Sequence, residues 1–211
     1  MRLFTTPASP WVRRCVVAIK ELGLEDKVEF VPTRWPHTWA TKTIAFDPAF
    51  LDATPVGRIP ALVTDDGLRL ADSGAICDYL NTELGGCRLM PAKGIERWRM
   101  QSVISIANGL VEAQISRRAE LLRDARERSA DFIEKMRQRE QRCFAALEPA
   151  VDGFGADVDL AQIAVATACD YADFRYPAED WRRAAPGLAR WFAQFSERPS
   201  MRSTKPVETP Q

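Results

Sequence analysis

The first 84 residues contain short apolar runs that are typical of strands, separated by stretches with helical periodicity. Strand-like runs occur at residues 27–32 ("KVEFVP") and 60–64 ("PALVT"), and an earlier one lies in "MRLFTTP" at the start of the chain. Between residues 64 and 71 ("TDDGLRLA"), Asp66-Gly67 separates two apolar stretches, which predicts a hairpin. This order predicts an α/β layer that begins with a βαβ unit and ends with an antiparallel ββα unit.

Two helices are predicted in the same segment from their end signals. The stretch "SPWVRRCVVAIKELGL" has Ser9 at the N-cap, Pro10 at the first helical position and Gly23 as a C-cap. The second helix covers residues 71–84 ("ADSGAICDYLNTEL"). The stretch between the strand-like runs at 27–32 and 60–64 is predicted to be irregular.

Beyond the "GGCRLMPAKG" segment the strand signals disappear, and helical periodicity continues to about Arg198. In "DLAQIAVA", Asp159 and Gln162 form a capping box before an apolar run, which predicts a helix in the centre of the core. Two apolar helical stripes support this assignment: Phe132, Met136, Cys143 and Leu147, and Leu188, Trp191, Phe192 and Phe195. We therefore predict an α/β domain over residues 1–84, a linker over 85–94 and an all-α helical-bundle domain over 95–211, with a loosely held polar tail.

The overall composition excludes several classes of function. The 29 basic residues equal the 29 acidic ones, so no global charge attracts nucleic acid. No stretch approaches the roughly 20 apolar residues of a membrane span, and the chain does not start with an apolar leader, so a cytoplasmic protein is expected. The five cysteines (15, 77, 87, 143 and 169) show no CxxC or CxxH spacing, which argues against a disulfide framework and against a metal site.

Three features of the first segment bear on chemistry. They are Ser9-Pro10 at a helix start, Ile59-Pro60 directly before a strand, and Asp72-Ser73 at the next helix start. Taken singly, each has an ordinary structural explanation. Ser9 and Asp72 are common helix caps, and Pro60 is tolerated at the first position of a strand.

Taken in order, the three features resemble the N-terminal, thioredoxin-like domain of the glutathione transferases. The helical remainder is similar to the all-α C-terminal domain of the same family, so the resemblance covers nearly the whole chain. It includes "DLAQIAVA" and the ending "RPSMRSTKP", and "SPWVRR" looks like the bacterial serine-type members. The resemblance implies a two-fold homodimer and glutathione as co-substrate, with no metal.

The resemblance also implies a role for each motif. Ser9 would donate a hydrogen bond to the sulfur of glutathione. A cis Pro60 would expose the backbone of Ile59, which would pair with the cysteinyl part of the tripeptide.

The remaining motif would hold the γ-glutamyl end of glutathione. The Asp72 carboxylate would take the amino group, while Ser73 and the helix N–H groups would take the α-carboxylate. Arg58 would assist at a carboxylate of the tripeptide. Thr54 stands where the family usually has asparagine, a departure that affects the turn rather than the chemistry.

The chemistry needs only one side-chain proton donor. A free cysteine thiol titrates near pH ~8.5, and lowering that pKa by about two units requires about 2.7 kcal/mol of preferential stabilisation of the anion. One charge-assisted hydrogen bond contributes roughly 1.5–3 kcal/mol, and a helix N-terminus adds roughly 0.3–1. Because a hydroxyl both donates and accepts, Ser9 can cap the helix through Val12 N–H while donating its proton to the sulfur.

An electrophile pocket is expected beside the thiol. Thr6 and Trp11 would line it from the first domain, and four residues of the long helix would form the other wall: Trp98, Ser102, Ser105 and Ile106. Thr5 and Thr6 are alternative hydroxyls to Ser9. His37, the only histidine, and its neighbours Trp35 and Trp39 are interpreted as packing or solvated groups.

The expected activity is conjugation of glutathione to a small hydrophobic electrophile. A dithiol oxidoreductase is disfavoured because no cysteine stands at or beside Ser9, and a tyrosine-type transferase is disfavoured because the first tyrosine is Tyr79. Two alternatives stay open: a glutathione-binding carrier with little turnover, and an isomerase or dehalogenase of the same superfamily.

Overall fold

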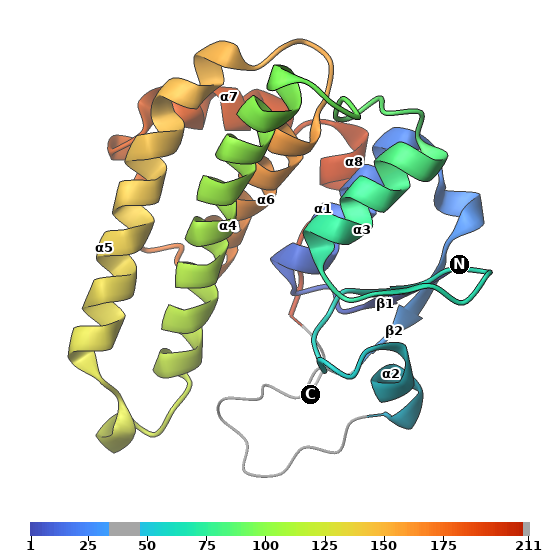
Figure 1. The fold of residues 1–211 in the computed structure, drawn as a ribbon. Coiled ribbons are helices and arrows are strands. Elements are labelled where there is room, and N and C mark those ends of the chain that lie inside the picture. The colour runs from blue at the N-terminus through green and yellow to red at the C-terminus, as the bar shows by residue number, and fades with distance from the viewer. Residues whose placement is uncertain (34–46, 209–211) are drawn as a thin grey trace.

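The computed structural model describes residues 1–33 and 47–208; His37, Trp35 and Trp39 lie outside them. A small sheet with flanking helices is followed by a group of helices packed beside it, as Figure 1 shows. Residues 85–94, which contain no helix or strand, run between the two parts. This architecture confirms the predicted fold class, a thioredoxin-like α/β part followed by an all-helical part.

Within the described residues, four strands form one mixed sheet with the order β2-β1-β3-β4. Their bounds are β1 Arg2–Thr5, β2 Glu29–Pro32, β3 Ala61–Val63 and β4 Arg69–Leu70. β1 pairs parallel with β2 and antiparallel with β3, and β3 pairs antiparallel with β4. The predicted βαβ start, the ββα end and the hairpin at Asp66-Gly67 are confirmed, and Gly67 has the positive φ that such a turn requires.

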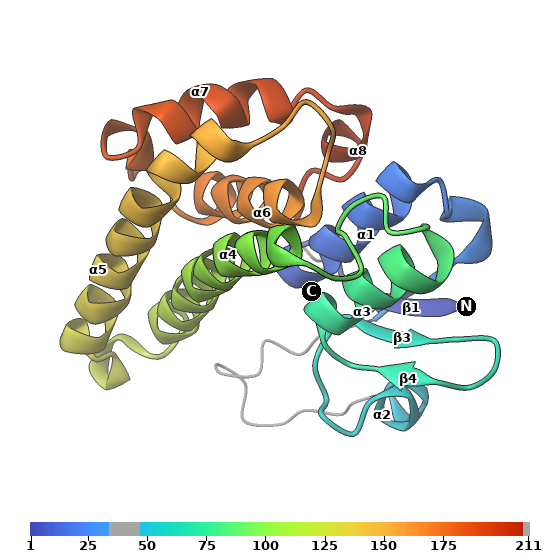
Figure 2. The same cartoon turned by 45° about the horizontal axis from the view of Figure 1, so that its top comes forward.

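Helices cover both faces of this sheet. On one face lie α1 (Pro10–Leu22) and α3 (Ser73–Tyr79), which continues as a π-helical turn over Leu80–Leu84. The opposite face is covered by α2 (Pro48–Ala53), as Figure 2 shows. The prediction of an irregular stretch was wrong at α2, where Asp47 accepts a hydrogen bond from the backbone of Ala49 and caps a helix opened by proline.

The C-terminal helices are α4 Ile95–Leu121, α5 Ala130–Leu147, α6 Leu160–Arg175, α7 Pro186–Phe195 and α8 Pro199–Arg202. Short 3₁₀ turns occur at Glu25–Lys27, Ala125–Glu127, Glu148–Gly153 and Trp181–Arg183. The capping box of Asp159 and Gln162 is present, and α6 is buried along most of its length. This confirms the prediction of a central helix, and α4 and α5 lie side by side with α5 on the outside (Figure 1).

The two predicted apolar stripes differ in how far their residues are buried. In α7, Leu188, Phe192 and Phe195 are buried as predicted. In α5, Leu147 is buried but Phe132 is 38% exposed. Phe132 lies in the first turn of α5, and this end of the helix is the one farther from α7 (Figure 1).

The contact between the two parts is extensive and partly charged. One hydrophobic core cluster includes residues of both parts, and α1 packs directly against α6. The prediction of a loosely held tail was wrong for its described portion, because Arg13 donates to Thr204 at 3.2 Å and Arg175 donates to Glu208 at 2.5 Å. None of the helices in the described ranges is long and apolar enough to cross a membrane.

Candidate functional site

The sheet register brings the three predicted motifs to one edge. Phe4 pairs with Ala61, so the chain beyond β1 emerges beside Pro60, which directly precedes β3. Leu62 pairs with Leu70, so Asp72 emerges on the other side of Pro60. Helix starts at Ser9 and Asp72 therefore flank the Ile59-Pro60 bond.

Ser9 has the predicted geometry of a helix cap. Its Oγ accepts a hydrogen bond from Val12 N–H at 3.3 Å, and Pro10 occupies the first turn of α1. Ser9 is half-buried, and nothing within residues 1–33 and 47–208 accepts its hydroxyl proton. A partly accessible O–H at the start of a 13-residue helix is well placed to donate to an anion.

The neighbouring hydroxyl of Thr5 is already used in the sheet. Thr5 Oγ1 donates to the carbonyl oxygen of Val31 at 3.4 Å. Thr6 is buried. Of the hydroxyls of Thr5, Thr6 and Ser9, that of Ser9 therefore has the geometry best suited to donate to a bound ligand.

The middle motif has a cis peptide bond between Ile59 and Pro60, as predicted. Pro60 is buried and Ile59 is half-buried, at the entrance to β3. Arg58 is exposed and forms no ion pair within the described parts of the chain, so its guanidinium faces solvent. Thr54 caps the end of α2 through its backbone N–H.

The third motif also caps a helix. Asp72 Oδ1 accepts from the N–H groups of Gly74 at 2.8 Å and Ala75 at 3.0 Å. Asp72 is exposed, whereas Ser73 is 5% exposed and its hydroxyl has no hydrogen-bond partner in the described segments. A carboxylate and a hydroxyl on adjacent residues can together bind the amino and carboxylate groups of an amino acid.

The residues predicted to form an electrophile pocket do not gather in one place. Trp11 is partly buried and packs against the hydrophobic core, as does Ile106. Trp98, Ser102 and Ser105 share an exposed face of α4, with Trp98 66% exposed. Their role in an electrophile pocket stays a prediction.

A cavity of about 310 Å³ lies instead between α3 and α4. Asp72 and Cys77 line it from α3, Gln101 and Asn108 from α4, and Arg14 from α1. Sequence reasoning missed these α4 residues and Arg14. The sequence does carry a signal that Arg14 is buried. The helix around it is largely apolar, so two consecutive arginines cannot both lie on a polar face.

Arg14 is a buried cation with an incomplete set of partners. Its Nη1 donates to Asn108 Oδ1 at 2.6 Å, and its guanidinium lies 5.1 Å from the centre of the Trp11 ring. Its Nε and Nη2 are buried without a hydrogen-bond partner among the residues that the structure describes. Burial lowers the pKa of Arg14, and interactions with Cys77, Cys15 and Asp72 oppose that shift.

The described residues contain no group of three or more His, Cys, Asp or Glu side chains that could hold a metal ion.

Comparisons with known proteins agree with this architecture. Residues 8–83 match the family model "Glutathione S-transferase, N-terminal domain", and residues 112–194 match "Glutathione S-transferase, C-terminal domain". A crystal structure of a glutathione transferase family member from Pseudomonas fluorescens Pf-5, with bound glutathione, is 36% identical. The match covers 98% of this chain and 99% of that one, with a TM-score of 0.90.

A second structure of the same Pseudomonas fluorescens Pf-5 family member and one further relative agree with this match. The second structure, with bound S-(propanoic acid)-glutathione, is 35% identical, over 99% of this chain and 100% of that one, with a TM-score of 0.86. "Uncharacterized GST-like protein YibF" of Escherichia coli (strain K12) is 29% identical over 98% of both chains.

The fold and the site define a two-part protein whose thioredoxin-like sheet presents Ser9, cis Pro60 and Ser73 at one edge. The chain belongs to the glutathione transferase family.

Proposed function

We propose that this protein binds glutathione at the sheet edge and conjugates its thiolate to a small hydrophobic electrophile. Asp72 and Ser73 hold the γ-glutamyl end, and the backbone of Ile59 pairs with the cysteinyl part. Ser9 donates its proton to the sulfur, and Arg58 stands near a carboxylate of the tripeptide. Glutathione and S-(propanoic acid)-glutathione, bound in two structures of one relative from Pseudomonas fluorescens Pf-5, support the choice of ligand.

The observation that carries this proposal is the unused proton of Ser9. Its lone pair accepts from Val12 N–H, which fixes the direction of the hydroxyl, and its proton has no acceptor in the described parts of the chain. A sulfur at this position completes the hydrogen bonding of Ser9. A hydrogen bond to an anion contributes roughly 1.5–3 kcal/mol, enough to hold a large fraction of the thiol ionised near neutral pH.

The residues then have simple tasks in the reaction. The thiol proton leaves to solvent, and Ser9 stabilises the thiolate that remains. With an aryl halide, the sulfur attacks the ring carbon, the new carbon–sulfur bond forms, and the halide departs with its bonding electrons. Conjugation therefore needs no metal and no internal base.

Replacing Ser9 by alanine tests the catalytic role. We expect Ser9→Ala to lower kcat/KM for an aryl halide by about 10- to 100-fold, which corresponds to about 1.4–2.7 kcal/mol. The pKa of bound glutathione, read from the thiolate absorbance, should rise toward that of the free thiol. Thr5→Val is the matched control, because its hydroxyl is bonded within the sheet and its loss should leave the rate unchanged.

The same experiments separate the alternatives. Full conjugation by Ser9→Ala would contradict the role of Ser9, and Thr6→Val would then identify whether the neighbouring hydroxyl acts instead. Tight glutathione binding with no turnover on any electrophile would favour a carrier. Isomerase or dehalogenase activity would appear as consumption of a substrate without net loss of glutathione.

We further propose that the active form is a cytoplasmic homodimer. Trp98 and Ile95, at the start of α4, are 66% and 63% exposed, a large apolar area to leave in water. All five cysteines are free, which fits a reducing compartment. Sedimentation of the wild type and of Trp98→Lys checks this, because the charged variant should sediment as a monomer.

A further inference from the structure

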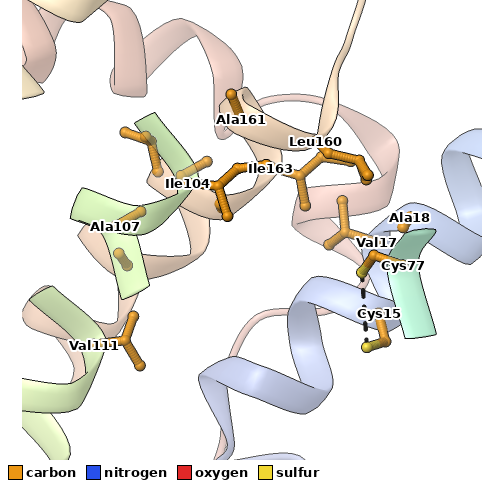
Figure 3. Close-up of a cluster of buried hydrophobic side chains, with 14 of the residues drawn as sticks. Cys15, Val17, Ala18, Cys77, Ile104, Ala107, Val111, Leu160, Ala161 and Ile163 are labelled. Carbon is orange, nitrogen blue, oxygen red and sulfur yellow. Dashed lines mark hydrogen bonds between the residues drawn. The ribbon is translucent and has the colours of Figure 1, made fainter. Parts of the chain in front are cut away.

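Two buried cysteines face each other between α1 and α3. The Cys77 thiol donates to the sulfur of Cys15 at 3.8 Å, shown by the dashed line in Figure 3. The Cys15 thiol in turn donates to the backbone carbonyl of Ser73 at 3.7 Å. Neither thiol has a part in the proposed activation of glutathione, so the pair is available for separate chemistry.

A buried positive charge lies beside this pair. Arg14 directly precedes Cys15, and its charge interacts with Cys77 and Cys15. Its hydrogen-bond partner in the described segments is the neutral amide of Asn108, and two of its nitrogens stay unpaired. The Asp72 carboxylate also acts on Arg14 through its charge but forms no hydrogen bond with it in the described segments. A buried cation stabilises negative charge that develops on a sulfur beside it during oxidation.

The two thiols differ in access. Cys77 lines the cavity of about 310 Å³ between α3 and α4, together with Arg14, whereas Cys15 does not line it. This volume is about ten times the share of one water molecule, roughly 30 Å³, so hydrogen peroxide fits easily. Burial raises the pKa of Cys15 well above its usual value, so Cys15 stays a thiol until Cys77 has reacted.

We propose that Cys77 and Cys15 form a peroxide-oxidised thiol pair that closes an intramolecular disulfide. The Cys77 sulfur attacks one oxygen of hydrogen peroxide, the O–O bond breaks, and water leaves with the thiol proton. Cys77 is then a sulfenic acid. The sulfur of Cys15 attacks it, the S–O bond breaks, and the proton of Cys15 leaves with the second water. Two thiols are oxidised and one peroxide is reduced to two waters.

Disulfide formation would change the positions of the two helices that begin at the sheet edge. The sulfur–sulfur separation must shorten from 3.8 Å to about 2.05 Å, which draws α1 and α3 together. Cys15 also loses the proton that it donates to the Ser73 carbonyl. The two helices that begin at Ser9 and Ser73 thus become covalently joined.

The test is oxidation of the folded, full-length chain by hydrogen peroxide. After denaturation and alkylation, the number of alkylated cysteines should fall from five to three, and one cross-linked peptide pair should contain Cys15 and Cys77. Cys169 is an internal control, because it is equally buried, belongs to another helix and should stay reduced. Five alkylated cysteines, or a disulfide that omits Cys77, would overturn the proposal.

Variants resolve the order of the steps. Cys15→Ser should stop at a sulfenic acid on Cys77, and Cys77→Ser should leave Cys15 reduced. Cys143→Ser, on α5, should form the disulfide at the wild-type rate. Arg14→Gln should slow it about tenfold, which corresponds to about 1.4 kcal/mol of electrostatic stabilisation lost with the charge. An unchanged rate for Arg14→Gln would overturn the role given to the charge.

Two results keep this proposal separate from the proposed function. If the reduced protein fails to bind glutathione in a calorimetric titration, the proposed function is wrong while the cross-linked peptide stands. If glutathione binds and no cross-linked peptide forms, the thiol pair is wrong while the transferase proposal stands. The cross-linked peptide is read from the wild type, so it does not depend on how well any serine variant folds.

Discussion

Arg13 and Arg14 are neighbours in α1 and are both almost completely buried, yet their surroundings differ. All three guanidinium nitrogens of Arg13 face oxygens: Nη1 forms an ion pair with Asp170 at 2.5 Å, Nη2 donates to the Met201 carbonyl, and Nε donates to Thr204. Arg14 has one amide acceptor and two unpaired nitrogens in the described residues. Arg13 therefore fastens α1 to the C-terminal helices, and Arg14 brings a largely uncompensated charge to the cavity.

The difference shows how burial alone fails to define a role. Burial lowers the pKa of both arginines. Asp170 opposes this shift at Arg13 through its charge and a hydrogen bond, whereas Arg14 forms no ion pair within the described residues and has only the charges of Cys77, Cys15 and Asp72. A paired buried cation is costly to disrupt, because its partner is left unpaired. An unpaired one contributes little to stability and is retained where an anion forms or binds. The two arginines should therefore respond very differently to the same substitution.

The largest effect is expected for Arg13→Met. This change leaves the Asp170 carboxylate without its partner and removes two hydrogen bonds to the C-terminal segment, so we expect a loss of about 3 kcal/mol in the free energy of unfolding. Urea denaturation at pH 7 measures it. Asp170→Asn in the Arg13→Met background should recover part of the loss, and equal stability of the two proteins would contradict the pairing.

Giving Arg14 a carboxylate partner should make its contribution to stability resemble that of Arg13. Asn108→Asp places an anion where Nη1 already donates at 2.6 Å, and we expect a gain of about 1.5 kcal/mol in the free energy of unfolding. The same change should slow oxidation of Cys77, because Arg14 then has a fixed counter-ion. Asn108→Ala serves as the control, and a gain in that variant would show that the charge is irrelevant.

Another ion pair joins the C-terminal end of α1 to the C-terminal helices. Arg198 donates twice to Glu21, at 2.9 Å each, and these bonds lower the pKa of Glu21. A lowered pKa in the folded state means that the stabilisation is present above the unfolded pKa and is lost as the pH falls through the folded one. Glu21→Gln should cost about 1 kcal/mol at pH 7, because the pair is partly solvated.

The pH profile checks that prediction. Denaturation curves of Glu21→Gln and wild type should differ at pH 7, begin to converge as the pH falls below about 4.3, the usual pKa of glutamate, and coincide only below the lowered pKa of folded Glu21. A difference that persists undiminished in acid would assign the effect to packing rather than to charge.

The smallest effect is expected for Arg14→Met. Replacing a buried charge that lacks an anionic partner with an apolar side chain of similar volume is often neutral, so the free energy of unfolding should change by less than about 0.5 kcal/mol. Asn108 is half-buried and can bind water instead. A loss comparable with that of Arg13→Met would remove the distinction drawn between the two arginines.

Local signals predicted much of the fold because they act over a few residues. Caps at Ser9, Gly23 and Asp159, and the hairpin at Gly67, depend on hydrogen bonds or turns within five positions of the chain. The helix α2 also has a local start signal, because Asp47 is its N-cap and Pro48 is its first residue.

Long-range features were harder to predict. Sheet register, which gathers the motifs at one edge, and the partners of Arg13, 157 to 191 positions away, follow from tertiary packing. The exposure of Phe132 has the same origin, because helical periodicity does not reveal where a covering helix stops. The predicted roles of Ser9, Ile59 and Ser73 came from family resemblance, and the structure adds their common location.

The contact between Arg13 and Thr204 has a consequence for synthesis of the chain. A ribosome makes α1 long before residue 204, so the helix that begins at Ser9 gains its anchor at Thr204 only after about 190 further residues have been added. Nascent chains that end between Asp170 and Met201 would have Arg13 tethered at Asp170 alone.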